Sequence, residues 1–275
     1  MFTLNCKGRL WVVDKPQVMG IINCTPDSFY EGSRLMDARK IGEKAADMFA
    51  QGAAVVDLGA QSTRPGAETI SAEEEWERLL PAIESVKTHC PELLISIDTF
   101  YASVAEKAIK AGGDMINDIS GGTYEPEILS IAADYQVPYI CMHMKGTPAT
   151  MQHLASYENV TTEVLDHFIE RLDTCQKAGI NDVIIDPGFG FAKTIEHNFT
   201  LLKELSSFAI LKRPVLVGLS RKTTIWKTLG TSPDQALNGT TVLNTIALMN
   251  GASFLRVHDV REAWEAVQLV QQCLK

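Results

Sequence analysis

The chain has 275 residues, of which 45% are hydrophobic and 21% are charged, as is typical of a globular enzyme. Its formal net charge of −9, without a basic stripe, argues against a nucleic-acid partner. No apolar run approaches the roughly 20 residues of a membrane helix and no signal core begins the chain, so we expect no membrane partner and a cytoplasmic location. The six scattered cysteines include no Cys-x-x-Cys pair, which predicts reduced thiols.

The chain begins with a predicted hairpin, in which Thr3–Val13 forms two short strands around a turn at Lys7 and Gly8. Eight short apolar runs follow, each ending in polar residues: Val18–Asn23, Ala54–Gln61, Leu93–Thr99, Met115–Ser120, Pro138–His143, Val183–Asp186, Val215–Ser220 and Phe254–His258. We interpret these runs as strands, and we expect the hairpin to cover the bottom of the structure that they form.

Stretches with helical spacing of apolar residues separate these strands. The predicted helices are Met36–Gln51, a helix opening at Ser71 and ending before Pro91, Tyr101–Ala111, Glu125–Tyr135, Val160–Ala178, Thr194–Leu205, Asp234–Asn250 and Arg261–Leu274. Ser71 to Glu74 form a capping-box pattern, and Glu73–Glu75 indicate a solvated helix start. The alternation predicts an α/β fold, a (β/α)8 TIM barrel in a single domain, with the hairpin in residues 1–16 and the barrel in residues 17–275.

Polar residues at the strand ends form the candidate site, because a (β/α)8 barrel carries its active site at the carboxyl ends of its strands. Asp98, Asn117 and Asp186 would project hydrogen-bond acceptors from three of these ends. Such acceptors suit a neutral heterocycle rich in N–H donors, and Phe191 with Met142 or Met144 would supply apolar faces for its ring. A buried structural network without a ligand is the alternative.

The loops after the first two barrel strands add further candidates. Asn23 ends the first strand, and its amide oxygen can bind Mg²⁺ or accept a hydrogen bond from a substrate. The loop after the second strand places two hydroxyl groups beside Arg64, an arrangement that suits an anion. An ordinary surface turn is the alternative interpretation of both loops.

Cations follow the last two strands. The loop after the seventh strand contributes Gly218, Ser220, Lys222 and Thr223, where barrels often bind phosphate. A Schiff-base role for Lys222 and a basic surface turn are the alternatives. Arg256 and His258 are two residues apart, so they share one side of their strand and suit a diphosphate leaving group.

In order along the chain, from Met19 to Val260, these motifs resemble the dihydropteroate synthase family. The matching pieces are Met19–Phe29, Ser62–Ala67, Ser96–Thr99, Ile116–Gly122, Met142–Met144, Asp186–Phe191, Ser220–Lys222 and Arg256–Asp259. The resemblance implies a transferase of folate biosynthesis that condenses 6-hydroxymethyl-7,8-dihydropterin diphosphate with 4-aminobenzoate. It also implies early loss of the diphosphate, after which the aniline nitrogen captures the pterin cation.

The resemblance further implies roles for individual positions. It implies that Asp98, Asn117, Asp186 and Lys222 hold the pterin, and that Asn23, Arg256 and His258 hold the diphosphate with Mg²⁺ near Asn23. It places Thr63, Arg64 and Pro65 on a mobile loop over the site and Phe29 on another. The catalytic candidates are Asp98, Lys222, Arg256 and His258, and the late helices are expected to form a homodimer.

Two positions depart from the family pattern: Glu31 stands where aspartate is more common, and Thr223 stands where serine often follows the lysine. A pterin-binding barrel methyltransferase and a non-catalytic pterin-binding paralogue are the alternative functions. The methyltransferase would need the pterin carboxylates but not Lys222, Arg256 and His258. Their presence therefore favours the synthase.

Overall fold

The computed structural model describes residues 1–24, 31–61 and 69–274. Of residues 31–37 it describes the backbone only. Its parallel strands are β3 (Gln17–Asn23), β4 (Val55–Gly59), β5 (Leu94–Asp98), β6 (Met115–Asp118), β7 (Tyr139–Met142), β8 (Val183–Asp186), β9 (Leu216–Val217) and β10 (Phe254–Val257). They pair in the order β8-β7-β6-β5-β4-β3-β10-β9. A parallel bridge between Ile185 and Val215 joins β8 to β9 and closes the sheet, so the predicted barrel is confirmed.

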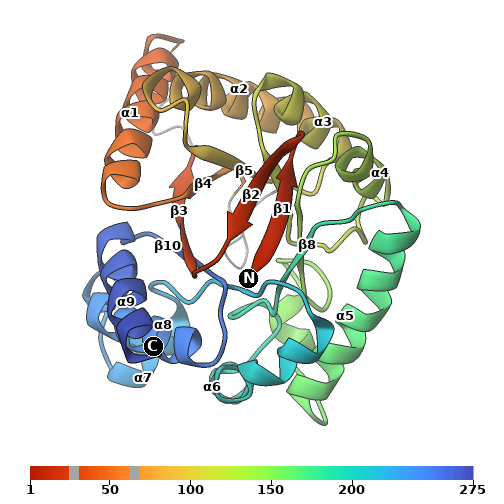
Figure 1. Ribbon diagram of the computed structural model, residues 1–275, viewed down its shortest axis with the longest axis vertical. Coiled ribbons are helices and arrows are strands. Elements are labelled where there is room, and N and C mark those ends of the chain that lie inside the picture. The colour runs from red at the N-terminus through yellow and green to blue at the C-terminus, as the bar shows by residue number, and fades with distance from the viewer. Residues whose placement is uncertain (25–30, 62–68, 275) are drawn as a thin grey trace.

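Helices surround the strands as a ring (Figure 1). They are α1 (Glu31–Ala50), α2 (Ala72–His89), α3 (Ala102–Ala111), α4 (Glu127–Asp134), α5 (Val160–Lys177), α6 (Ile195–Lys203), α7 (Thr223–Leu229), α8 (Leu237–Met249) and α9 (Val260–Cys273). Short 3₁₀ helices cover Met151–Leu154, Leu205–Leu211 and Pro233–Gln235. The sequence predicted the long helices, whereas α7 was foreseen only as a helix start because it has just seven residues.

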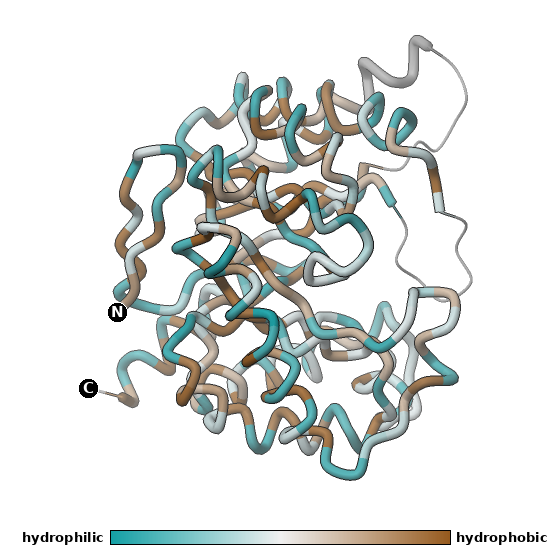
Figure 2. Tube along the Cα trace, turned by 90° about the vertical axis from the view of Figure 1, so that its right-hand side faces the viewer, coloured by the Kyte–Doolittle hydropathy of each residue, from teal (hydrophilic) through white to brown (hydrophobic). Residues whose placement is uncertain are grey.

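The amino-terminal hairpin covers the bottom of the barrel, as predicted. Its strands β1 (Phe2–Cys6) and β2 (Arg9–Val13) meet at Lys7 and Gly8, which both have positive φ, as a tight hairpin turn requires. In Figure 1 the hairpin lies across the middle of the ring, and Figure 2 shows it at one edge of the molecule. Its inward side chains pack against the lowest layer of the barrel interior.

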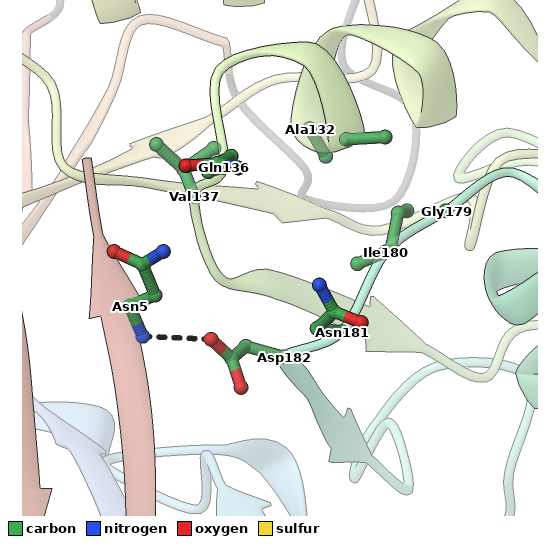
Figure 3. Close-up of a pocket in the computed structure, with 9 residues that line it drawn as sticks. Asn5, Ala132, Gln136, Val137, Gly179, Ile180, Asn181 and Asp182 are labelled. Atoms are coloured by element: carbon green, nitrogen blue, oxygen red, sulfur yellow. Dashed lines mark hydrogen bonds between the residues drawn. The ribbon is translucent and has the colours of Figure 1, made fainter. Parts of the chain in front are cut away.

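A polar contact fixes the hairpin against the loops at the amino ends of the strands. The backbone N–H of Asn5 donates to Asp182 Oδ2 at 2.7 Å (Figure 3), and the N–H of Lys7 donates to the carbonyl of Gln136 at 3.2 Å. The small pocket in Figure 3 lies among these residues. It is at the opposite end of the barrel from the strand ends predicted to carry the site.

The side chains inside the barrel change from apolar to polar along the strands. The lowest layer takes one buried apolar residue from each strand: Met19, Val55, Leu94, Met115, Ile140, Ile184, Leu216 and Phe254. Because successive strand residues alternate sides, the next inward layer is two residues further on. It consists of Ile21, Asp57, Ser96, Asn117, Met142, Asp186, Gly218 and Arg256. The two-residue period of the strands therefore places most of the inward polar residues in one layer, above an apolar layer at the bottom of the barrel.

The start of α2 differs from the prediction in one residue. Ser71 caps the helix, since its Oγ accepts from the N–H of Glu74 at 3.2 Å. Glu73 and Glu74 are exposed as expected, but Glu75 is 0% exposed. The helical spacing places Glu75 on the inward face with Leu79, one turn later, so a solvated start was wrong for this residue.

All six cysteines are free thiols, as the absence of a disulfide pattern predicted, and Cys273 is the exposed one.

No helix in the described part of the chain is long and apolar enough to cross a membrane. The cytoplasmic location stays a prediction.

Candidate active site

A partly buried arginine links carboxylates from two neighbouring strands. Arg256 on β10 donates from Nε to Asp57 Oδ2 at 2.6 Å and from Nη2 to Asp98 Oδ2 at 2.8 Å. Asn117 Nδ2 also donates to Asp57 Oδ2, at 3.0 Å. The structure therefore brings together Asp98, Asn117 and Arg256, three residues singled out from the sequence, and it joins them through Asp57.

Asp57 is a residue that sequence reasoning missed. It lies inside an apolar run rather than at a strand end, and it is completely buried. Asp57 and Ser96 are register partners on β4 and β5, and the same inward face carries Asn117. The two-residue strand period was the signal that could have found it. Its second oxygen, Oδ1, and Ser96 Oγ have no hydrogen-bond partner among the described residues.

Burial and these contacts shift the pKa values of Asp98 and Arg256 so that the two groups differ in charge behaviour near neutral pH. Burial raises the pKa of Asp98 to about 7, although the nearby charge of Arg256 lowers it, and the charge of Asp57 raises it further. Burial disfavours the charged form of Arg256, but Asp57 and Asp98 together hold its pKa above the ordinary value. Arg256 is therefore a permanent cation, whereas Asp98 gains or loses a proton near neutral pH.

A second group lies around Lys222 at the carboxyl ends of β8 and β9. Lys222 Nζ donates to the carbonyl of Phe189 and lies 4.8 Å from the centre of the Phe191 ring. Asp186 is buried, and its Oδ1 accepts from the N–H of Gly188 at 2.8 Å. An added Cβ at Gly218 would lie 3.7 Å from Lys222 Nζ, so the missing side chain leaves space beside the ammonium group.

Burial shifts both charged groups of this second set toward neutrality. It lowers the pKa of Lys222 to about 8, and the charge of Asp186 opposes that shift. Burial likewise raises the pKa of Asp186, against the effect of Lys222. The charge of each group therefore opposes the effect of burial on the other.

His258 lies at the rim, beside Ser220. The ring Nδ1 is 3.1 Å from Ser220 Oγ, which also accepts from the backbone N–H of His258 at 3.2 Å. Desolvation and the charge of Arg256 lower the pKa of His258 to about 4, so the imidazole is neutral near neutral pH. The Ser220 contact at Nδ1 leaves Nε2 as the ring atom available to a ligand.

The two adjacent cations after β9 have different partners. Arg221 forms a two-point ion pair with Asp259, with both N···O distances at 2.8 Å, so it is engaged there rather than with the site. Lys222 contacts the β8 loop instead. Thr223 is the exposed first residue of α7.

The remaining candidates fall at the edge of the site or outside the description. Asn23 is exposed at the end of β3, and Met142 is buried at the end of β7 in the same layer as Asn117 and Asp186. Phe29, Thr63, Arg64 and Pro65 lie outside the described residues, as does the Glu31 side chain.

Comparison with known proteins identifies the family. The chain matches the family model of pterin binding enzymes over residues 19–258. It is 42% identical over 276 residues to the dihydropteroate synthase of Escherichia coli strain K12, covering 98% of this chain and 96% of that protein. The chain belongs to the dihydropteroate synthase family. It is therefore a transferase, and the resemblance inferred from its motifs is confirmed.

Solved structures of the family share the fold over the full length. The dihydropteroate synthase of Yersinia pestis, solved with a sulfonamide drug, superposes with a TM-score of 0.90 at 38% identity, covering 99% of each chain. The enzyme of Xanthomonas albilineans in complex with 7,8-dihydropteroate superposes with a TM-score of 0.87 at 35% identity, covering 99% of this chain and 98% of that one. These likenesses support the synthase and not the methyltransferase or the non-catalytic paralogue.

Proposed function

We propose that this chain condenses 6-hydroxymethyl-7,8-dihydropterin diphosphate with 4-aminobenzoate to give 7,8-dihydropteroate and pyrophosphate. The observation that carries the proposal is the distribution of charge at the carboxyl end of the barrel. Asp98, Asn117 and Asp186 offer acceptors to a heterocycle, and Lys222 offers it a donor. Arg256 and His258 offer donors to an anion. The Xanthomonas albilineans relative in complex with 7,8-dihydropteroate supports the product.

The groups that bind the pterin ring form hydrogen bonds with the polar edge of the ring. A buried carboxylate such as Asp186 is costly unless donors satisfy it, and the N–H groups of an aminopyrimidinone supply such donors. Asn117 adds an amide, and Lys222 donates to a ring acceptor. Met142 and Phe191 provide apolar surface for the faces of the ring.

The carbon–oxygen bond between the pterin methylene group and the diphosphate breaks first, and the oxygen keeps the electron pair. The carboxylates of Asp98 and Asp186 stabilise the positive charge that develops on the pterin, while Arg256 and His258 stabilise the departing diphosphate. The aniline nitrogen of 4-aminobenzoate then forms the new carbon–nitrogen bond and loses a proton. Opposite charges thus face each end of the breaking bond.

Mg²⁺ fits this site as an ion that accompanies the diphosphate. Among the described residues no cluster of three or more His, Cys, Asp or Glu side chains could hold a metal ion. The exposed amide oxygen of Asn23 is a single neutral ligand, and Mg²⁺ commonly combines one or two protein ligands with substrate phosphate oxygens and water. The ion would supply positive charge to the leaving diphosphate, with Asn23 as its protein ligand.

A homodimer is the proposed assembly. Val242, Ile246 and Met249 lie on the outer face of α8, with exposed fractions of 51%, 39% and 53%. Their spacing forms one apolar stripe along the helix. Such a stripe is costly in water, and a second copy of the chain that packs against it would bury it.

The experiment that tests the proposed reaction measures pyrophosphate release by the purified protein with both substrates and Mg²⁺. We expect pyrophosphate and 7,8-dihydropteroate in equal amounts. A protein that binds the pterin without turnover would instead be a non-catalytic paralogue. Release of pyrophosphate without formation of 7,8-dihydropteroate, when both substrates are present, would contradict the condensation.

A further inference from the structure

We propose that Lys193 is a positioning residue that fixes the loop between β8 and α6, and through that loop orients Asp186 and Lys222 toward the pterin ring. The inference deepens the proposed function and rests on it. Lys193 follows the loop residues Gly188 to Ala192. Neither the sequence motifs nor the proposed reaction assigns it a role.

The contacts of Lys193 tie the loop together from inside. The side chain is 4% exposed, and its Nζ lies 2.9 Å from His143 Nδ1. The same Nζ donates to the carbonyl of Gly188 at 3.1 Å and to the carbonyl of Phe191 at 3.0 Å. None of the three partners is a carboxylate. An ammonium group supplies three donors from one atom, which matches this number of partners.

The backbone of this loop needs such support. Gly188 and Gly190 have φ values of +70° and +82°, and Ala192 has a φ of +48°, in the left-handed region that a side chain disfavours. An added Cβ at Gly188 would lie 2.0 Å from the carbonyl oxygen of His143, so the loop packs directly on the end of β7. Such a conformation persists only where surrounding contacts determine it.

The loop forms hydrogen bonds with two side chains of the proposed pterin site, so its conformation determines where they lie. Asp186 precedes it and accepts from the N–H of Gly188 at 2.8 Å. The carbonyl of Phe189, between the two carbonyls that Lys193 binds, accepts from Lys222. Lys193 and Lys222 therefore bind different carbonyls of one short segment. The hydrogen bonds that Arg256 and His258 form among the described residues, by contrast, do not involve this loop.

The electrostatic surroundings agree with a role near Asp186. Burial lowers the pKa of Lys193 well below its ordinary value, and the charge of Asp186 opposes this shift. Burial and the charge of Lys193 also lower the pKa of His143, so the pair carries at most one positive charge near neutral pH. That charge lowers the pKa of Asp186 and favours its carboxylate, the form that accepts from the ring.

The test replaces Lys193 with methionine, which occupies a similar volume but supplies no donor. Dissociation constants are measured separately for 6-hydroxymethylpterin, which lacks the diphosphate, and for inorganic pyrophosphate with Mg²⁺. We expect Lys193→Met to bind the pterin at least tenfold more weakly and to bind pyrophosphate within twofold of the unmodified protein. The control is Lys203→Met, a change at an exposed lysine of α6, which should alter neither constant.

A merely structural role would weaken both ligands equally or neither, and either result would overturn the inference. If Lys193→Met does not fold, Lys193→Gln, which keeps two of the three N–H donors, must show a smaller loss that is selective for the pterin in the same way. Equal loss of both ligands or an unchanged pterin affinity in that variant would also overturn it. Unmodified protein that fails to bind the pterin would overturn the proposed function itself, which distinguishes the two failures.

Discussion

At the scale of single residues, the site depends on how burial and charge set protonation. Asp98 and Lys222 have pKa values of about 7 and about 8, so both titrate near neutral pH. The proposed reaction needs Asp98 as a carboxylate and Lys222 as an ammonium group. Both forms coexist best between those two values.

The dependence of kcat/KM on pH follows from these two groups. As pH falls through about 7, Asp98 gains a proton and activity should fall; as pH rises above about 8, Lys222 loses its proton and activity should fall again. Asp98→Asn should lower kcat/KM on the order of 100-fold and remove the acidic limb. Steady-state kinetics from pH 5.5 to about 9.5 check this. An unchanged acidic limb in the variant would remove Asp98 from the mechanism.

Asp57 should influence the reaction through Arg256 and Asp98 without contacting substrate. Asp57→Asn removes a negative charge that raises the pKa of Asp98, so the acidic limb should move to lower pH. It also replaces a charged acceptor of Arg256, which should reduce the free energy of unfolding by about 1–3 kcal/mol. Denaturant titration and the pH profile measure the two effects. An acidic limb that moves to higher pH would contradict the assigned coupling.

At the scale of elements, each strand supplies an apolar residue to the base of the barrel, and five of the eight strands place a polar residue in the layer above it: Asp57, Ser96, Asn117, Asp186 and Arg256. The strands could be predicted because each is a short, local run of apolar residues that ends in polar ones. The inward position of Asp57 could have been predicted from the two-residue strand period, but its role could not, because Arg256, the partner that gives it that role, is 199 positions away. Likewise, only the tertiary ion pair with Asp259 distinguishes Arg221 from its neighbour Lys222. Local pattern thus predicts the elements, and long-range pairing decides the site.

The first turn of α2 should respond to pH through Glu75. Burial raises the pKa of this carboxyl above its ordinary value, so the folded state favours the protonated form. The free energy of stabilisation that protonated Glu75 contributes is therefore fully present below the ordinary glutamate pKa. It is lost as pH rises through the raised pKa of the folded state. Glu75→Gln should raise the Tm near pH 8 and change it little near pH 4. The control is Glu73→Gln, at an exposed position. A lower Tm for Glu75→Gln near pH 8 would contradict this account.

At the scale of the whole molecule, the barrel separates stability from chemistry. The hairpin and the lowest interior layer close the amino-terminal end with buried apolar side chains, while the carboxyl end holds the ionisable groups. The apolar stripe on the outside of α8 lies on the helical ring. A dimer through this stripe would leave the barrel interior unchanged.

The proposed dimer can be tested on the stripe itself. Ile246→Glu places a charge at its centre, so a chain that pairs through α8 should become a monomer. Light scattering coupled to size-exclusion chromatography measures the mass. The control is Ile210→Glu, at an exposed apolar residue far from α8 in sequence. A variant that keeps the dimer mass would exclude α8 as the interface.

The central claim is that the carboxylates at the barrel opening bind the pterin, whereas Arg256 and His258 bind its leaving group. Separate calorimetric titrations with 6-hydroxymethylpterin and with pyrophosphate and Mg²⁺ test it directly on Asp186→Asn and His258→Ala. The account predicts a crossed result: Asp186→Asn loses at least tenfold in pterin affinity and keeps pyrophosphate affinity, and His258→Ala loses pyrophosphate affinity and keeps pterin affinity. Loss of the same ligand in both variants would contradict it.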